Sequence, residues 1–425
     1  MSGPALRERL ADRFRSLGHR NFRLYWSGQL VSLVGTWMQS VAQGWLMHRL
    51  TDSAFMLGLL GFMQFLPVLM FSLWAGVVAD RLDKRRLLYL TQGAALLQAA
   101  ALAVVVMTGV VRPWMVLVLA FVFGIINAFD LPVRQSFLIE MVVKEDLPNA
   151  IALNSAAFNT ARIIGPAIAG VLVATIGEGG CFALNAVSYL AVLYCLKLMR
   201  LPPRLAHAEG ASRRVTLREG VAYAIAEGPI RNLLLLLGLT AGLGFQYMVL
   251  LPVYASHILH GGPGAYGLMV SAFGIGALLA AVRLTQDLDR WGLRRNLLAG
   301  LLLSGVGLAV FAWSRSLALT LPMGLIAGLG LIVYVASVNT LLQLRTEDRF
   351  RGRVMSLYTL MFVGTAPIGA LASGAIAERW SAPVATTFNA AVLLAGAVWV
   401  AYRLRIMAAR ERARPADQPQ VERIG

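Results

Sequence analysis

Charged residues are scarce in this chain of 425 residues, and the scarcity excludes an ordinary soluble domain. Only 14% of the residues are charged and 58% are hydrophobic, whereas soluble domains carry about 25% charged residues. Cysteine is rare as well. Cys181 and Cys195 are spaced 14 apart, which fits no metal-binding motif, so we expect both to be inert packing residues.

Catalytic motifs are also missing. The sequence has no glycine-rich nucleotide-binding loop with its lysine, which argues against a built-in ATP motor. No serine–histidine–aspartate or zinc-binding pattern occurs in an apolar segment. We therefore expect no enzymatic activity and no cofactor. Acids are absent from the centres of the apolar segments, and Asp130 lies nearest to one, which makes it the candidate for a proton carrier.

Long apolar segments, in contrast, are abundant. Twelve of them approach the ~20 residues that a helix needs to cross the hydrocarbon core of a bilayer. They cover residues 24–47, 54–79, 87–109, 114–133, 153–176, 181–199, 233–256, 266–282, 296–313, 317–341, 354–377 and 384–403. The sequence therefore predicts an all-α membrane protein with twelve transmembrane helices.

The basic residues predict how these segments are oriented. Of the 38 Lys and Arg residues, 33 fall on the side of the N-terminus, Arg162 lies within a segment, and four fall on the other side. Cationic loops are retained in the cytoplasm, so we expect both termini to be cytoplasmic and the membrane to be a bacterial inner membrane. Topology and contact with anionic lipid explain the net charge of +17, and the basic residues form no stripe or domain for nucleic acid.

The longest polar stretch separates two halves that look like weak repeats. Asn127, Gly165-Pro166 and Asn185 occur in order in the first half, as Asn339, Pro367 and Asn389 do in the second. Six segments plus six, with a central loop, is a common construction of secondary transporters. The predicted parts are a six-helix bundle, a cytoplasmic linker, a second six-helix bundle and a disordered cytoplasmic tail, at residues 1–196, 197–232, 233–404 and 405–425.

The linker contains the pattern of a short amphipathic helix. Thr216 and Glu219 have the spacing of a capping box, and Leu217, Val221 and Ile225 recur every four residues. Such a helix either lies on the inner leaflet or is an ordinary linker helix in the cytosol.

A polar motif follows the second segment. It consists of Gly76, Asp80 and Arg81, then Lys84 and Arg85, and a weaker copy occupies 289–295 in the second half. The two copies resemble the loop signature of the major facilitator superfamily, glycine-x-x-x-aspartate-arginine-x-glycine-arginine-arginine, with Asp83 in place of the usual glycine. The resemblance covers nearly the whole chain and implies two pseudo-symmetric six-helix bundles around a midplane cavity.

In that superfamily this loop is thought to latch the two halves in one state. The resemblance implies that Asp80 approaches the start of the eleventh segment. It also implies that the cations meet an acid at the end of the fourth segment, where Asp130 stands one turn before Arg134. The alternative is simple solvation of charges at a loop.

A second resemblance lies in the fourth and fifth segments. Asp130-Leu-Pro132-Val-Arg134-Gln135 and Asn159-Thr-Ala-Arg162-Ile-Ile-Gly165-Pro166 are similar to the subgroup that contains the enterobactin exporter and related drug and macrolide exporters. Gly165, Pro166 and Gly170 resemble the fifth-segment motif of facilitator antiporters, with incomplete flanking glycines. With Pro367, they are expected to let the helices bend and pack closely. The resemblance implies export coupled to protons.

Arg162 stands about 15 Å deep in the fifth segment. A charge facing lipid there would cost at least about 2.5–3.5 kcal/mol, so the side chain should face a wet cavity or the other half. Ser155, Asn159, Arg162 and Pro166 share one helix face. Two hypotheses follow: Arg162 contacts a polar or anionic substrate or an internal acid, or it pairs with Asp130 and only stabilises the fold.

The first segment carries a polar stripe formed by Gln29, Ser32, Thr36, Gln39 and Gln43. These side chains fall within about 80° of arc and are poor lipid contacts. We expect them to line an aqueous path, and the alternative is hydrogen bonding between packed segments. By resemblance, segments 1, 4, 7 and 10 line that path, with further polar groups at Asn127, Thr240, Gln246, Tyr247, Asn339 and Gln343.

Amides, hydroxyls and aromatic rings suit a moderately large, partly apolar solute. The sequence therefore predicts a monomeric secondary transporter that exports a small organic molecule, either a siderophore-like metabolite or a drug. An importer of the same fold, a lipid flippase and a non-transporting sensor are the alternatives. His257 and His260, three residues apart near the outer end of the seventh segment, could bind metal or sense pH, but we expect exposed loop residues.

Asp80→Asn is expected to reduce transport while leaving membrane insertion intact, because a neutral side chain cannot form the predicted charge-assisted contacts. Flux is compared between cells that hold equal amounts of wild type and variant in the membrane. Unchanged flux would exclude the latch.

Overall fold

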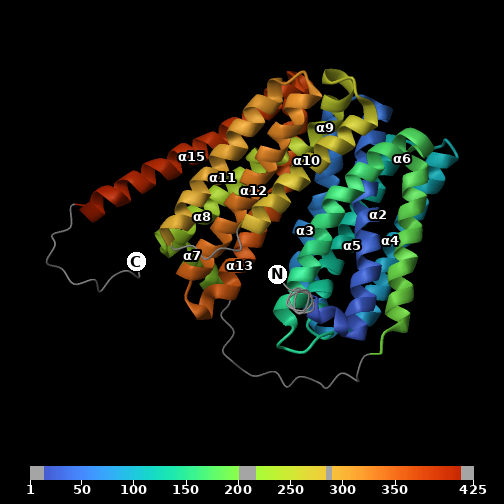
Figure 1. Cartoon of the computed structure of the whole chain (residues 1–425), viewed down its shortest axis with the longest axis horizontal. Coiled ribbons are helices and arrows are strands. Elements are labelled where there is room, and N and C mark those ends of the chain that lie inside the picture. The colour runs from blue at the N-terminus through green and yellow to red at the C-terminus, as the bar shows by residue number, and fades with distance from the viewer. Residues whose placement is uncertain (1–13, 201–216, 284–289, 413–425) are drawn as a thin grey trace, which may run out of the picture.

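A computed structural model of the chain describes residues 14–200, 217–283 and 290–412 (Figure 1). These residues form helices, and no strand occurs among them, which confirms the predicted all-α fold. The elements of the first half are η1 (Arg15–Gly18), α2 (Arg20–Thr51), α3 (Ala54–Arg81), α4 (Lys84–Met107), α5 (Pro113–Leu138) and α6 (Leu147–Leu198).

The second half is less regular. Its seventh segment is a succession of short elements between residues 228 and 258, and its eleventh is divided between α13 and α14. The elements are α7 (Leu217–Ala226), α8 (Gly228–Leu239), η2 (Thr240–Gly244), η3 (Gln246–Leu250), α9 (Leu251–Val253), η4 (Tyr254–Ile258), α10 (Gly262–Arg283), α11 (Arg290–Trp313), α12 (Leu317–Arg345), α13 (Asp348–Val363), α14 (Ala366–Arg379) and α15 (Ala382–Arg412).

The described helices supply twelve membrane crossings. Ten stretches are long and apolar enough to span a bilayer. One of them, α6, has 52 residues and breaks at Gly177, where φ is 73°, so it supplies two crossings. A left-handed backbone there favours glycine, which has no Cβ to clash. The polar stripe lowers the hydropathy of the 32-residue α2, which supplies the remaining crossing.

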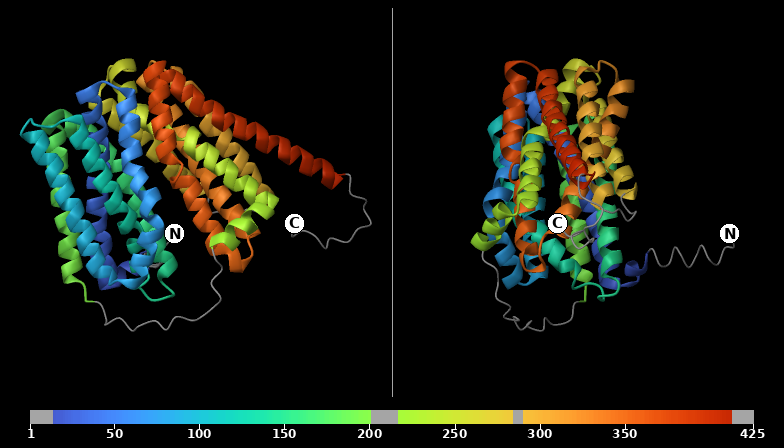
Figure 2. Two further views of the ribbon diagram at one scale, coloured as in Figure 1. Left: turned by 180° about the vertical axis from the view of Figure 1, so that it is seen from behind. Right: turned by 90° about the vertical axis from the view of Figure 1, so that its left-hand side faces the viewer.

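The helices form two bundles, α2–α6 and α7–α15 (Figures 1 and 2). The bundles touch at one end, where α2, α3 and α6 meet η4, α14 and α10, and we call this the closed end. They diverge toward the end that holds the N-terminal η1, which we call the open end (Figure 2).

One pair of contacts shows the internal repeat directly. Asn185 of α6 donates from Nδ2 to Gln39 of α2 at 2.7 Å, and Asn389 of α15 donates from Nδ2 to the Leu243 carbonyl of η2 at 2.6 Å. Each contact joins the last segment of a half to its first, and both span 146 residues of sequence.

Small residues bring the two bundles together backbone against backbone at the closed end. A Cβ at Gly267 of α10 would lie 2.4 Å from the Pro166 carbonyl oxygen and 2.9 Å from Gly170 Cα. A Cβ at Gly58 of α3 would lie 2.6 Å from the Ala370 carbonyl oxygen of α14. Pro166 and Gly170 thus lie at an interface between the bundles.

The other predicted packing residues lie within their own bundles. A Cβ at Gly165 would meet the Val34 carbonyl oxygen of α2 at 2.8 Å. Pro367 is buried in the first turn of α14, where its missing N–H leaves no helix hydrogen bond unmade.

The predicted linker helix is α7. It packs on α13, where Tyr223 stacks on Phe350 with ring centroids 4.2 Å apart. Ile225, on the predicted apolar face, is 57% exposed. Thr216, half of the predicted capping box, lies outside the described residues.

The tail prediction is wrong for residues 405–412. α15 continues to Arg412, because these residues are mostly good helix formers and the first proline, Pro415, comes later. Residues 413–425 lie outside the described ranges.

Gly267→Ala is expected to destabilise the contact between the bundles by about 1–3 kcal/mol, because its Cβ would overlap the backbone of α6. The midpoint of thermal unfolding of the purified protein should fall. Gly93→Ala in α4 is the control, since its Cβ would meet nothing within 4 Å and alanine favours helix by up to about 1 kcal/mol. Equal midpoints for the two variants would contradict this account.

Candidate functional site

Arg162 of α6 is a cation in the membrane-spanning region whose donors are not all used. Its Nε and Nη2 atoms are buried and have no hydrogen-bond partner. The guanidinium lies within electrostatic range of the Tyr247 hydroxyl in η3. A buried, unmade hydrogen bond of a charged group costs more than the ~1–3 kcal/mol of a neutral one. Arg162 therefore presents an unused pair of donors next to the second bundle.

The backbone around Arg162 is held against that second bundle. Ser271 of α10 donates from Oγ to the Ile163 carbonyl at 2.9 Å. A Cβ at Gly274, one turn later, would lie 3.3 Å from the Arg162 carbonyl oxygen. Asn159, which the sequence placed on the same face, donates from Nδ2 to the Ser155 carbonyl within α6 at 2.9 Å. The crossing of α6 and α10 thus fixes the backbone from which Arg162 extends.

The structural alternative for Arg162, a pair with Asp130, is not observed. The Asp130 side chain is 3% exposed and forms an ion pair with Arg134, one turn later in α5. Thr91 Oγ1 and Gln92 Nε2 of α4 both donate to Asp130 Oδ1, at 2.7 and 2.8 Å. This cluster lies inside the first bundle, and its carboxylate is satisfied without Arg162.

The described cations of the predicted latch also contact the first bundle. Lys84 Nζ lies 2.6 Å from Glu140 Oε1, and Arg85 Nη2 donates to the Leu196 and Lys197 carbonyls at 2.7 and 3.2 Å. In this conformation Lys84 and Arg85 therefore contact groups other than Asp130, and their contact with Asp130 in a latched state stays a prediction. Since α5 extends to Leu138, five residues beyond the predicted segment, Glu140 is the acid at its end.

The remaining residues of the motif lie in different surroundings, and two of their side chains are not described. The side chains of Asp80 and Arg81 lie outside the described residues. Gly76 faces open space, since a Cβ there would meet nothing within 4 Å. Asp83, which departs from the family pattern, accepts from the Arg86 N–H at 2.7 Å and caps α4. An aspartate before a helix is a recognisable cap, so the sequence carried this signal.

The polar stripe of α2 faces the interior of the first bundle. Gln29, Ser32, Gln39 and Gln43 are each at most 4% exposed. Gln39 accepts from Asn185 and donates to Gln98 Oε1 at 3.1 Å. In this conformation Gln39 matches the alternative interpretation, hydrogen bonding between packed helices, whereas Gln29 Nε2 and Ser32 Oγ are buried without a hydrogen-bond partner.

Thr36 and Gln43, two further members of the stripe, also form hydrogen bonds to neighbouring helices of the first bundle. The Thr36 and Tyr189 hydroxyls are 3.1 Å apart, and Gln43 Nε2 donates to the Val116 carbonyl at 3.3 Å.

The other predicted path residues divide into two groups. Thr240, buried in η2, hydrogen-bonds the Tyr334 hydroxyl at 2.9 Å, and Gln246 donates to the Ala241 carbonyl at 2.7 Å. Asn339 accepts from Gln343 Nε2 at 2.5 Å within α12, and Gln343 is exposed.

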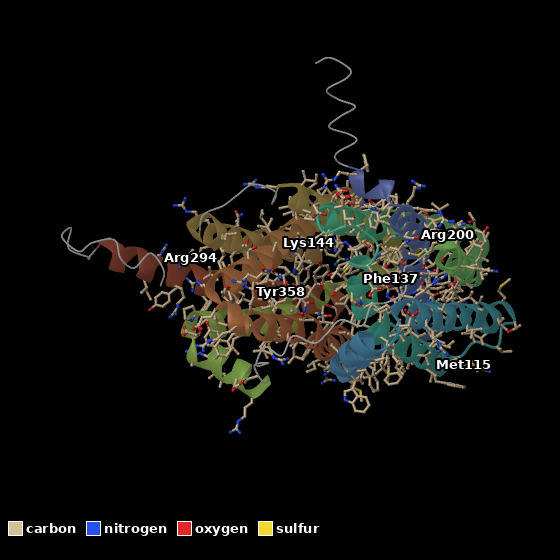
Figure 3. The ribbon with its side chains drawn as sticks, turned by 90° about the horizontal axis from the view of Figure 1, so that it is seen from below. Met115, Phe137, Lys144, Arg200, Arg294 and Tyr358 are labelled. Carbon is tan, nitrogen blue, oxygen red and sulfur yellow. The ribbon has the colours of Figure 1, made fainter. Side chains whose placement is uncertain are left out.

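Asn127 of α5 and Asn339 are both half-buried, and the Asn339 side chain lies near Tyr358 of α13. Sequence reasoning did not single out Tyr358, because a tyrosine in an apolar segment is an ordinary packing residue. Figure 3, a view from below toward the open end, shows Tyr358 on the second bundle and Phe137 on the first.

Comparison with known proteins gives consistent matches. The family described as transmembrane secretion effector matches residues 11–423. The chain is 29% identical over 357 residues to the staphyloferrin A transporter of Staphylococcus aureus, covering 82% of this chain and 87% of that protein. It is 27% identical over 363 residues to the multidrug efflux pump Tap of Mycolicibacterium fortuitum, with the same two coverages. A solved structure of a point mutant of the nucleoside transporter NupG shares the fold, with a TM-score of 0.69 at 14% identity over 93% of this chain and 99% of that one.

Asp130→Asn is expected to destabilise the first bundle by about 3–5 kcal/mol, because it leaves the Arg134 cation without its buried partner. Thermal unfolding of purified protein measures the loss. The double variant Asp130→Asn/Arg134→Gln should lose less than the two single variants combined.

Glu140→Gln is the control. The Glu140 carboxylate is 37% exposed, and a surface pair contributes at most about 1 kcal/mol. The account would be wrong if Glu140→Gln cost as much as Asp130→Asn.

Proposed function

Because the chain belongs to the transmembrane secretion effector family of the major facilitator superfamily, as its motifs predicted, we propose that it exports a small organic molecule by alternating access. The observation that carries the proposal is the Arg162 guanidinium beside the second bundle, whose Nε and Nη2 nitrogens are buried without a hydrogen-bond partner. A planar guanidinium suits a carboxylate or another planar anionic group of a substrate. The names of the relatives, a transporter of one metabolite and a multidrug pump, support the two predicted substrate classes.

The position of the open end supports an inward-facing conformation. The open end carries the N-terminal η1 and the basic starts of α4 and the linker, which the topology prediction assigns to the cytoplasm. A cytoplasmic solute could then approach from the open end, while the closed end separates it from the outside. Both termini would be cytoplasmic in the inner membrane, and one chain would suffice.

The outward-facing state would require the closed end to separate and the open end to close. The contacts between Gly267 and Pro166 and between Gly58 and Ala370 would then open. The latch predicted for Asp80, Arg81, Lys84 and Asp130 would stabilise that second state. Proton coupling, which rests on the family resemblance, has its candidate in Asp130, because a proton on this carboxylate would remove the charge that pairs with Arg134.

The test uses a deletion strain complemented with wild type, Arg162→Gln or Lys197→Gln, grown under iron limitation. Lys197 is the control because it is an exposed cation of the same helix. Untargeted mass spectrometry compares medium and cell contents. Arg162→Gln should reduce export at least about tenfold at equal membrane levels, as expected for a charged hydrogen bond worth about 1.5–3 kcal/mol.

A metabolite that is lost from the medium of the deletion strain and accumulates inside its cells, relative to the complemented strain, would establish export and identify the substrate. The reverse distribution would establish import and overturn the proposal. Full rescue by Arg162→Gln would remove Arg162 from the substrate path. No metabolite difference would exclude the siderophore-like class, and the same strains would then be compared by their resistance to a panel of drugs.

A further inference from the structure

A cluster of three potential metal ligands bridges the two bundles at the closed end. His48 is in the last turn of α2, Asp52 is the residue that ends α2, and His257 is in η4 of the second bundle. One ligand atom from each lies within 4.8 Å of the others. His257 Nε2 is 3.1 Å from Asp52 Oδ1, and His48 Nε2 is 3.8 Å from the same oxygen. Neither the family motifs nor the substrate path uses these residues.

Local backbone geometry brings the three side chains together. Asp52 has φ 49°, and its N–H donates to the His48 carbonyl, so the chain turns sharply where α2 ends. Aspartate adopts this left-handed conformation more readily than most residues. On the opposite side, His257 lies in η4, the wide turn that ends the seventh segment. His260, the other histidine predicted near this end, is exposed and does not belong to the cluster.

From this geometry we propose that His48, Asp52 and His257 bind Zn²⁺ or a similar divalent transition-metal ion, which ties the bundles together at the closed end. Two imidazoles and a carboxylate are a common set of three zinc ligands, with water at the fourth position. Tetrahedral ligands about 2.0–2.1 Å from zinc stand about 3.4 Å from each other. The observed separations of 3.1 and 3.8 Å require only small side-chain adjustments.

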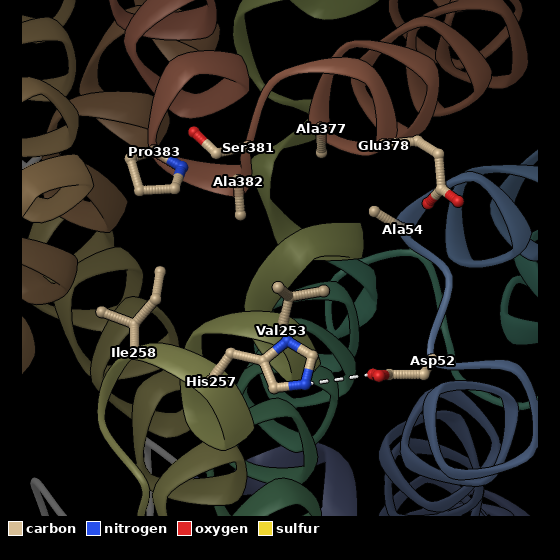
Figure 4. Close-up of a pocket in the computed structure, with 10 residues that line it drawn as sticks. All are labelled: Asp52, Ala54, Val253, His257, Ile258, Ala377, Glu378, Ser381, Ala382 and Pro383. Carbon is tan, nitrogen blue, oxygen red and sulfur yellow. Dashed lines mark ion pairs between the residues drawn. The ribbon is translucent and has the colours of Figure 1, made fainter.

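The surroundings provide space and negative charge for a cation. A cavity of about 360 Å³ opens beside the cluster and is lined by Asp52, His257 and Glu378, among others (Figure 4). The Glu378 carboxylate accepts from Ser53 Oγ and the Phe55 N–H at 3.1 and 3.2 Å, so it adds negative charge from a fixed position. The neighbouring cation Arg49 is paired with Glu178 at 2.8 Å.

His48 can exchange its present partner for a metal. Its Nε2 atom now lies 2.6 Å from Ser256 Oγ. Ser256 Oγ has a second acceptor, the Val253 carbonyl at 3.3 Å, so it keeps a partner when Nε2 is taken by the ion. His48 is 5% exposed, whereas the side chains of His257 and Asp52 are 52% and 69% exposed. The buried imidazole is thus held in place, and the two exposed ligands can close around an ion from outside.

The bridging geometry has a functional consequence. A bound ion would join α2 of the first bundle to η4 of the second, and these elements separate when the closed end opens. Metal binding would therefore favour the conformation seen here over one that is open at this end. The site would act as an external control on transport, whatever the substrate.

Binding is tested on full-length protein purified with a tag that contains no histidine, treated with EDTA and dialysed. Zn²⁺ is titrated in competition with a fluorescent chelator. We expect one ion per chain, and a dissociation constant about tenfold or more higher for His257→Ala and for Asp52→Asn, since even outer-shell partners of metal sites contribute 10–100-fold. His260→Ala is the matched control and should bind as wild type does. All variants are checked for a single peak by size exclusion.

Equal affinity of wild type, His257→Ala and Asp52→Asn would overturn the site, as would an equal loss in His260→Ala. The bridge is tested separately by spin labels at Lys144→Cys on the first bundle and Arg218→Cys on α7, with the native cysteines replaced by serine. Zn²⁺ should increase the population of molecules in which the two bundles are far apart at the open end, and His257→Ala should abolish this response. Binding without any change in the distances would overturn the bridge.

Discussion

Hydrocarbon offers no water, so every polar group inside the membrane needs a partner within the protein. This constraint organises the first bundle. Gln39 of α2 bonds Asn185 of α6 and Gln98 of α4, and Asp130 of α5 bonds Thr91 and Gln92 of α4, so these contacts connect four helices. Each contact fixes how far one helix can slide along its neighbour, because a shift would leave a buried polar atom without its partner at a cost of about 1–3 kcal/mol. These contacts join the helices of the first bundle. Gln29 Nε2 and Ser32 Oγ are buried without a hydrogen-bond partner, as are two donor nitrogens of Arg162, and Arg162 differs from the other two because it is charged.

The same constraint shapes the irregular seventh segment. Its departures from the α-helical pattern free backbone carbonyls, and two side chains take them up: Gln246 bonds the Ala241 carbonyl and Asn389 bonds the Leu243 carbonyl. A broken helix is tolerated at membrane depth only where protein groups replace the lost bonds. The second bundle thus contains interruptions in its seventh and eleventh segments, where the first bundle has continuous helices and a break only at Gly177.

Much of this architecture can be predicted from sequence, because it depends on quantities that a sequence contains. Apolar length and the bias of basic residues predict twelve segments and a repeat. Periodicity correctly places the α2 glutamines on one face, but it cannot say which neighbours that face meets, and here they meet α4, α5 and α6. The apolar run left Asp130 as the acid at the end of the fourth segment, but α5 continues beyond that run, so Glu140 is the acid that Lys84 meets in this conformation. The bridge between His48 and His257 depends on how the halves dock, and no local pattern contains that information.

One helix links the proposed substrate site to the contact between the bundles. α6 carries Arg162, then Pro166 and Gly170, which lie about 6 and 12 Å farther along its axis. Ser271 of α10 is bonded to the Ile163 carbonyl, so an anion at Arg162 would bear directly on the crossing of α6 and α10. A ligand shifts a conformational equilibrium only by its difference in affinity for the two states. Arg162 meets that requirement in the proposed cycle, because separation of α6 from α10 changes its distance from Tyr247 and from any anion held between the bundles.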